Sequence, residues 1–216
     1  MQIHYNNELI MVQRVFCIGR NYVAHAEELG DDIPKKPIIF TKPSTSLVNK
    51  DIKTVKYPTF GNELHYEAEL VVMIGKDGYA KSEEEASDFV EAVSLGFDLT
   101  MRDVQNELMV NGLPWEIAKG FDNSGLIGNF VAAKGLDLAN FAYSGLVNGE
   151  IRQQGDTSLM IFNINRLICE LSKIWKLRKG DLIYTGTPAG VGEVFRGDIL
   201  SVKAREIGEF SWKIID

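Results

Sequence analysis

Two acidic residues stand directly in front of an uninterrupted apolar segment, and this junction limits the folds that the chain can adopt. Segment 65–69, His-Tyr-Glu-Ala-Glu, leads into segment 70–74, Leu-Val-Val-Met-Ile, which predicts a buried strand. Because alternate residues of a strand share one face, His65, Glu67 and Glu69 are expected to point to the same side. The two carboxylates repel each other, and apolar surroundings screen that repulsion poorly.

A bound cation would relieve the repulsion between Glu67 and Glu69. Carboxylate oxygens are hard ligands, which favour Mg²⁺, Mn²⁺ or Ca²⁺ over Zn²⁺. From this segment alone, a solvated edge of an antiparallel sheet is the alternative. A third carboxylate, Asp98, stands between Phe97 and Leu99. A carboxylate in such surroundings needs a partner, either a metal ion or, if the segment is helical, Arg102 four residues later.

A histidine and a glutamate are spaced three residues apart in a predicted helix over residues 22–29. His25 and Glu28 would therefore share one helix face. A carboxylate beside an imidazole raises its basicity and fixes its orientation, which suits a general base. An ordinary pair on the surface is the alternative.

Two further segments have the composition of a binding site. Lys119 stands between Ala118 and the pair Gly120-Phe121, which is unusual for a fully solvated lysine. The glycines of segment 185–192 let backbone amides approach a ligand closely. This segment lacks the Lys-Ser/Thr ending of a phosphate-binding loop, so a nucleotide site is not expected; a purely structural turn remains the alternative.

The pattern of apolar segments predicts an α+β fold rich in strands, arranged as a mixed β-roll or sandwich with a few short helices. Helices are expected over 22–29, about 83–95 and near 164–173, with a capping box formed by Ser82 and Glu85. Too few strand–helix–strand units occur for a doubly wound sheet. Strands are expected at Val15–Ile18, Ile38–Phe40, Leu70–Ile74, Leu182–Thr185, Ile199–Val202 and Phe210–Ile214.

Length, net charge and apolar content limit the classes of protein to which the chain can belong. A length of 216 residues suits one domain, and a formal net charge of −7 argues against a nucleic-acid partner. We expect no membrane association, because no apolar segment reaches the roughly 20 residues of a membrane span, and no signal peptide is visible. Cys17 and Cys169 form no metal-binding pair and are expected to be buried thiols in a reducing compartment. A cytoplasmic location is the expectation.

Seven motifs, taken in their order along the chain, resemble those of the fumarylacetoacetate hydrolase (FAH) superfamily. The resemblance is greatest to its small single-domain members, the acylpyruvases and FAH domain-containing proteins. The resemblance extends from about Val15 to the C-terminus. One departure is segment 125–128, Gly-Leu-Ile-Gly, where close relatives often have a Pro-Val-Ser type of segment; it affects the shape of a loop rather than the metal site. The motifs are Gly19-Arg20-Asn21-Tyr22-x-x-His25, Lys42-Pro43, His65-x-Glu67-x-Glu69-Leu70, Asp98-x-x-x-Arg102-Asp103-x-Gln105, Lys119-Gly120-Phe121-Asp122, Val147-Asn148-Gly149-Glu150 and Thr185-Gly186-Thr187-Pro188.

The resemblance implies a β-roll that usually forms a homodimer, with one divalent metal ion in each active site. The ion would be Mg²⁺ or Mn²⁺, for which Ca²⁺ can substitute in crystals. One catalytic domain would span residues 1–216, with a short lead-in over 1–14. Carried over by position, the metal ligands are Glu67, Glu69 and Asp98. The catalytic residues are His25, Glu28 and Lys119, with the first two on a short mobile lid helix, and the substrate contacts are Arg20, Lys42, Arg102, Gln105 and Thr187.

The resemblance also implies the reaction. The substrate would be a small 2-oxo acid, and the expected activity is hydrolysis of acylpyruvate-type 2,4-dioxo acids with release of pyruvate, together with decarboxylation of oxaloacetate. The alternatives within this class are keto–enol tautomerisation of oxaloacetate and isomerisation of a 2-hydroxymuconate type of substrate. A catalytically silent protein that binds a metal or ligand on the same fold is the alternative of another class. Retention of the three carboxylates and of the His25–Glu28 pair argues against it.

Overall fold

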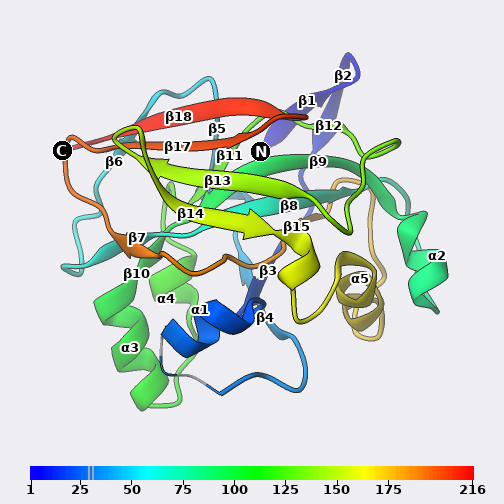
Figure 1. Cartoon of the computed structure of the whole chain (residues 1–216), viewed down its shortest axis with the longest axis horizontal. Helices are drawn as coiled ribbons and strands as arrows, with labels where there is room; N and C mark the ends of the chain where they lie inside the picture. The colour runs from blue at the N-terminus through cyan, green and yellow to red at the C-terminus, as the bar shows by residue number, and fades with distance from the viewer. Residues whose placement is uncertain (29, 31) are drawn as a thin grey trace.

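The computed structural model describes residues 1–28, 30 and 32–216, and in this part of the chain the largest element is a mixed sheet of eight strands (Figure 1). Two neighbouring pairs, β3 with β15 and β5 with β11, are parallel, and the other pairs are antiparallel. The order of the strands is β4 (Ile38–Lys42), β3 (Val15–Gly19), β15 (Leu182–Tyr184), β8 (Ala68–Ile74), β9 (Val90–Asp98), β11 (Gly125–Ile127) and β5 (Leu47–Asn49), with β12 (Val131–Ala132) paired to β9.

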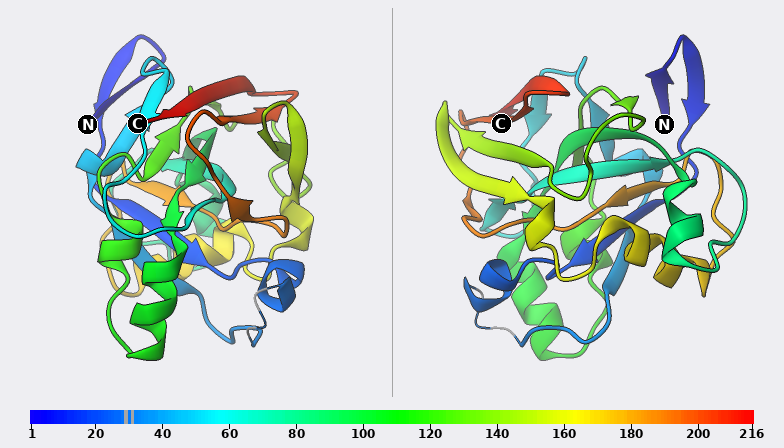
Figure 2. Two further views of the ribbon diagram at one scale, coloured as in Figure 1. Left: turned by 90° about the vertical axis from the view of Figure 1, so that its left-hand side faces the viewer. Right: turned by 45° about the vertical axis from the view of Figure 1, so that its right-hand side comes forward.

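Smaller sheets surround this one. A five-stranded sheet runs β14 (Glu150–Asp156), β13 (Ala142–Val147), β17 (Ile199–Ala204), β18 (Gly208–Ile215) and β6 (Thr54–Lys56). A three-stranded sheet runs β10 (Thr100–Met101), β7 (Leu64–Tyr66) and β16 (Gly192–Glu193). The hairpin of β1 (Gln2–Tyr5) and β2 (Glu8–Met11) stands out from the side of the molecule away from α1 and α3 (Figures 1 and 2).

The helices are short, as predicted, and none in the described residues is long and apolar enough to cross a membrane. The prediction of a strand-rich α+β fold with a few short helices is confirmed. The helices are α1 (Val23–Glu28), α2 (Glu83–Ser87), α3 (Arg102–Val110), α4 (Glu116–Lys119) and α5 (Ile164–Ser172), with 3-10 turns at Ser44–Ser46 and Thr157–Leu159. Leu29, the last residue of the predicted first helix, lies outside the described residues.

The predicted helix over 83–95 is wrong beyond its first turn and a half. Ser82 caps α2 as expected, because its hydroxyl accepts a hydrogen bond from Glu85 N (3.2 Å). The helix ends at Ser87, however, and residues 90–98 form β9. Valine and phenylalanine at helical spacing also favour a strand, and β9 lies between two partner strands that satisfy its backbone. Tertiary pairing therefore outweighed the local helical pattern.

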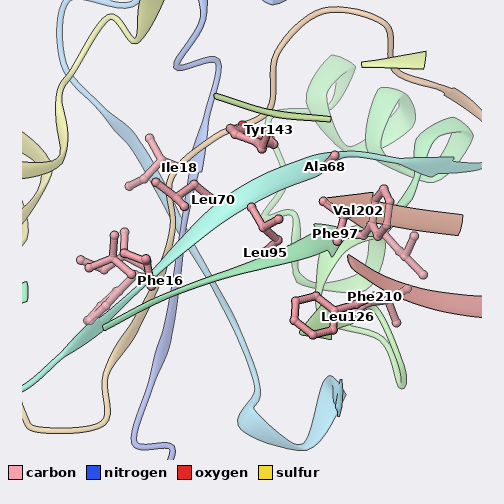
Figure 3. Packing of buried hydrophobic residues seen from close by; sticks show 14 of the residues in the cluster. Phe16, Ile18, Ala68, Leu70, Leu95, Phe97, Leu126, Tyr143, Val202 and Phe210 are labelled. Carbon is pink, nitrogen blue, oxygen red and sulfur yellow. The ribbon is translucent and has the colours of Figure 1, made fainter. Parts of the chain in front are cut away.

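Strand β8 is buried on both faces, and the alternation of its side chains divides the interior into two cores. Leu70 and Val72 belong to the main core between the eight-stranded and five-stranded sheets (Figure 3). Val71 and Met73 belong to a second core that the N-terminal hairpin covers. By the same alternation, Ala68 faces the main core, and Glu67 and Glu69 face the other way.

Close approach of the two sheets requires a glycine in β13. A Cβ atom built on Gly145 would lie 2.6 Å from the Cβ of Ala68. We expect Gly145→Ala to lower the free energy of unfolding by about 1–3 kcal/mol, the usual cost of overpacking, in a urea titration. Ser144→Ala in the same strand is the matched control, because it adds no atom. A Gly145→Ala protein as stable as the control would contradict this packing.

Candidate active site

The three carboxylates meet at one end of the large sheet because of the register between β8 and β9. Ala68 pairs with Phe97, and Asp98 N donates to Glu67 O (2.8 Å), so Asp98 lies opposite Glu67. Residues opposite each other in an antiparallel pair share a face, as do alternate residues of one strand. Glu67, Glu69 and Asp98 are buried, and one oxygen of each lies within 4.8 Å of the others.

Two cationic side chains compensate Glu67. Lys119 Nζ donates to Glu67 Oε2 (2.7 Å) and to Asp98 Oδ2 (2.9 Å), and Arg102 Nη2 donates to Glu67 Oε1. Burial alone would raise the pKa of Glu67, but the charges of Lys119 and Arg102 outweigh it and hold the pKa below its ordinary value. Burial would likewise lower the pKa of Lys119, yet Asp98 and Glu67 raise it. Glu67 and Lys119 are therefore charged at neutral pH.

Lys42 lies behind the carboxylates and is not among the residues that line the cleft. Its ammonium group lies 2.7 Å from Asp98 Oδ1 and donates to the backbone oxygens of Leu99 (3.3 Å) and Lys119. The sequence-based expectation was a substrate contact. In the structure Lys42 supports Asp98, and a contact with substrate stays a prediction.

Glu69 is the least compensated of the three carboxylates. Its Oε2 accepts a hydrogen bond from Gly186 N (2.8 Å), and among the described residues no cation forms an ion pair with it. Burial, and then the charges of Asp98 and Glu67, raise its pKa well above the ordinary value. Asp98 Oδ1 also lacks a hydrogen bond of acceptable geometry within the described part, although Lys42 Nζ is nearby. A pocket of oxygens with spare lone pairs, in which Glu69 forms no ion pair with a described side chain, fits a hard divalent cation.

The short helix α1 closely follows a firmly anchored residue, Asn21. Asn21 is fully buried, and its amide nitrogen donates to Phe162 O (3.0 Å) and Thr185 O (2.8 Å). Its amide oxygen accepts from Phe162 N (2.8 Å). Two segments distant in sequence therefore fix the start of α1, which is why this helix faces the carboxylates.

The predicted His–Glu pair forms on α1. His25 Nδ1 lies 3.5 Å from Glu28 Oε2, and His25 is only 3% exposed, whereas the Glu28 side chain is 35% exposed. Both Glu28 oxygens lie 3.1 Å from Gly190 N, which donates to them. Burial lowers the pKa of His25, although Glu67 and Glu28 act in the opposite direction. The imidazole is therefore neutral at pH 7, as a general base requires.

Arg102 begins α3 and pairs with Glu67 rather than with Asp98. Asp98 ends β9, so the two residues do not share a helix, and the helical alternative for Asp98 is wrong. Arg102 Nη1 donates to Gln105 Oε1 (2.5 Å), and Arg102 Nε donates to His65 Nδ1 (3.4 Å). Burial and the charge of Arg102 lower the pKa of His65 to about 4, so His65 is neutral.

One cleft of about 90 Å³ brings most of the predicted residues together. Glu28 and Lys42 are the predicted residues that do not line it. The sequence reasoning missed an apolar wall, which is formed by Phe40, Met109 and Trp115. The rings of Phe40 and Trp115 lie 5.7 Å apart, and Trp115 O accepts from Lys119 N (3.0 Å); an aromatic residue four positions before Lys119 was the available signal. The predicted residues that line the cleft are Arg20, His25, Glu67, Glu69, Asp98, Arg102, Gln105, Lys119 and Thr187.

Comparison with known proteins adds an independent finding. Residues 14–215 match the family model described as Fumarylacetoacetate (FAA) hydrolase C-terminal. The chain is 40% identical over 203 residues to the mitochondrial oxaloacetate tautomerase FAHD1 of Bos taurus, covering 94% of this chain and 91% of that protein. It is 38% identical over 189 residues to the mitochondrial oxaloacetate decarboxylase of Dictyostelium discoideum, covering 87% of each.

A solved structure is similar over the whole fold. The crystal structure of fumarylpyruvate hydrolase from Pseudomonas aeruginosa, in complex with Mn²⁺ and pyruvate, superposes with a TM-score of 0.94. It is 37% identical, and the similarity covers 100% of this chain and 95% of that one. The predicted FAH type of β-roll is thereby confirmed.

Removal of one carboxylate tests the metal site. We expect Glu69→Gln to weaken Mn²⁺ binding, measured by calorimetry, by more than the roughly 10–100-fold that loss of a residue supporting a metal ligand costs. The reason is that a neutral amide replaces the least compensated anion of the site. Glu84→Gln on exposed α2 is the control. Wild-type affinity in Glu69→Gln would remove this residue from the ligand set.

Proposed function

Because this chain belongs to the fumarylacetoacetate hydrolase family, we propose that it is a metal-dependent enzyme acting on small 2-oxo acids. Its main reaction is hydrolysis of a carbon–carbon bond in acylpyruvate-type 2,4-dioxo acids, which releases pyruvate. It also decarboxylates oxaloacetate. The observation that carries the proposal is one cleft that is lined by both the carboxylate cluster and His25. A metal site and a neutral base on facing elements are what hydrolysis of such a substrate requires.

The charge of the site supports an anionic substrate. The three carboxylates are already matched in number by Lys42, Lys119 and Arg102, which all pair with members of the cluster. A divalent cation would therefore leave a surplus of positive charge in the cleft. A 2-oxo acid carries at least one carboxylate, and oxaloacetate carries two, so these substrates would restore the balance.

Glu67, Glu69 and Asp98 would hold the metal ion, which we propose to be Mg²⁺ or Mn²⁺ because the donor set consists of carboxylate oxygens. When bound, such an ion supplies a Lewis acid that polarises the keto oxygen of the substrate and offsets the developing negative charge. Lys119, Arg102 and Gln105 would orient the substrate carboxylate beside it. Arg20 and Thr187 line the same cleft and would complete the substrate contacts.

His25 would supply the base for hydrolysis. Its neutral imidazole takes a proton from water, and the water oxygen attacks the distal carbonyl of the acylpyruvate. The carbon–carbon bond then breaks, its electron pair goes to the pyruvate part, and a proton returns to that carbon. Glu28 holds the imidazole and is itself held by Gly190 N. Decarboxylation of oxaloacetate needs no attacking water and therefore depends less on His25.

A second candidate function is keto–enol tautomerisation of oxaloacetate, which the name of the bovine relative favours. In that reaction His25 and Glu28 would only move protons, as they would in isomerisation of a 2-hydroxymuconate type of substrate. A catalytically silent binding protein is disfavoured, because the carboxylates and the base are retained together. Assays of acetylpyruvate and oxaloacetate with Mg²⁺, with and without a chelator, separate these possibilities.

Three broader expectations accompany this proposal. Residues 1–216 are proposed to act as one catalytic domain, and the chain is proposed to form a homodimer. A cytoplasmic location also remains a prediction, since the names of the bovine and Dictyostelium relatives place those proteins in mitochondria. Fractionation of the source cells tests it.

Variants of His25 and Lys119 should separate the two reactions. His25→Ala is expected to lower acetylpyruvate hydrolysis roughly 10²–10⁴-fold, because the base is lost, and to affect oxaloacetate decarboxylation less. Lys119→Ala is expected to weaken both reactions, because Lys119 contacts two metal carboxylates. Rates are measured at saturating Mg²⁺, with the exposed His4→Ala and Lys81→Ala as controls. Equal losses on both substrates in His25→Ala would favour the tautomerase instead.

The pH dependence of hydrolysis should report His25. The active imidazole is neutral, so activity disappears as pH falls through its pKa, which burial holds below the ordinary 6.5. A metal ion at Glu67 would lower this pKa further, since it cancels a charge that favours the imidazolium. The acid limb of kcat/KM for acetylpyruvate at saturating Mn²⁺ is therefore expected below pH 6.5. An identical limb in His25→Gln would assign it to another group.

Light scattering tests the proposed assembly. The chain has a mass of 24.1 kDa, so a homodimer at micromolar concentration should scatter as a particle of twice that mass. A mass that stays at one chain over this concentration range would exclude a stable dimer.

A further inference from the structure

A buried glutamine lies on the opposite face of β8 from the carboxylates. Gln153 belongs to β14 of the five-stranded sheet and is 1% exposed. Ala68, between Glu67 and Glu69, faces this sheet together with Leu70 (Figure 3). The amide of Gln153 therefore reaches the strand of the carboxylates from behind.

Both polar atoms of the Gln153 amide form hydrogen bonds. Its Oε1 accepts a hydrogen bond from Ala68 N (2.8 Å). Its Nε2 donates to Thr187 Oγ1 (2.7 Å) and to Pro188 O (2.8 Å), so both amide hydrogens are engaged. One side chain thus ties β8 to the loop over residues 185–190.

This connection replaces a missing strand partner. On one side β8 pairs with β9, and the backbone of Ala68 points to the other side, where β15 has already ended at Tyr184. Ala68 N bonds to Gln153, and Ala68 O accepts from Thr187 Oγ1 (2.9 Å). Two side chains therefore do at this point what a neighbouring strand does elsewhere in the sheet.

The same loop continues to the other parts of the site. Gly186 N donates to Glu69 Oε2 (2.8 Å), and Gly190 N donates to the carboxylate of Glu28. Thr187 lies between them and lines the cleft. A displacement of Gln153 would thus move a metal ligand, a cleft residue and the residue that holds His25.

We propose that Gln153 is a positioning residue that sets the spacing of the metal carboxylates and of loop 185–190 without touching substrate. The inference rests on the metal assignment under the proposed function. It is carried by three hydrogen bonds to groups that flank Glu67, Glu69 and Thr187, all made by one fully buried amide. A glutamine that only joined the two sheets would affect stability and leave the metal site unchanged.

The test compares two neighbouring glutamines. Gln153→Met keeps the length of the side chain and removes all three hydrogen bonds, whereas Gln154→Met changes the exposed neighbour in the same strand. Mn²⁺ affinity is measured by calorimetry at a temperature where thermal unfolding curves show each protein folded, and the electron paramagnetic resonance spectrum of bound Mn²⁺ is recorded. Gln153→Met is expected to raise the Kd for Mn²⁺ roughly 10–100-fold and to alter the spectrum, with Gln154→Met unchanged.

The outcomes separate this inference from the proposed function. Wild-type Mn²⁺ affinity and spectrum in folded Gln153→Met would overturn the positioning role alone. A wild-type protein that binds no Mn²⁺ would overturn the metal assignment and the positioning role together. If Gln153→Met does not fold, Gln153→Asn replaces it, because its amide is too short to reach both Ala68 N and Thr187 Oγ1. A raised Kd in Gln153→Asn supports the role, and an unchanged Kd overturns it.

Discussion

Burial of three carboxylates at the end of an apolar sheet is the constraint on which the rest of the structure depends. An uncompensated charge in such a place costs several kcal/mol, so the chain must supply partners from elsewhere. Lys42, Lys119 and Arg102 come from three different elements and converge on Glu67 and Asp98. Glu69 receives a backbone amide and no cation from the described residues, and this imbalance is what makes the cluster suitable for a metal ion.

Convergence of these groups depends on the register of strands rather than on any single contact. The pairing of Ala68 with Phe97 places Asp98 opposite Glu67, and a slip by one residue would turn the carboxylates toward the main core. Gly145 allows β13 to approach Ala68 closely, and Gln153 bonds to its backbone. The register is therefore supported from the face opposite the cleft, by residues that do not line it.

The parts of the site that follow from local periodicity could be predicted from the sequence. Alternation in β8 places Glu67 and Glu69 together, and helical spacing joins His25 to Glu28. The order of the motifs indicated the fold and the composition of the cleft. Parts that depend on distant contacts could not be derived in this way. The pattern over 83–95 predicted a helix, and pairing of β9 with its two neighbours makes residues 90–95 a strand. The position of Lys42 behind Asp98, the wall at Trp115 and the role of Gln153 likewise arise between segments far apart in the chain.

The two halves of the site are held in different ways, and this difference bears on the chemistry. The carboxylates belong to strands that are buried on both faces. His25 lies on a helix of six residues, which is held at its start by Asn21 and near its end by the contact of Glu28 with Gly190. Elements with few buried contacts open at a lower free-energy cost than a central strand. Under the proposed mechanism, a reaction that needs only the metal and an oriented carboxylate would tolerate displacement of α1, whereas hydrolysis would require α1 in place. One scaffold would in this way support both proposed reactions, and the hydrogen bond from Gly190 to Glu28 would favour hydrolysis because it holds α1 in place.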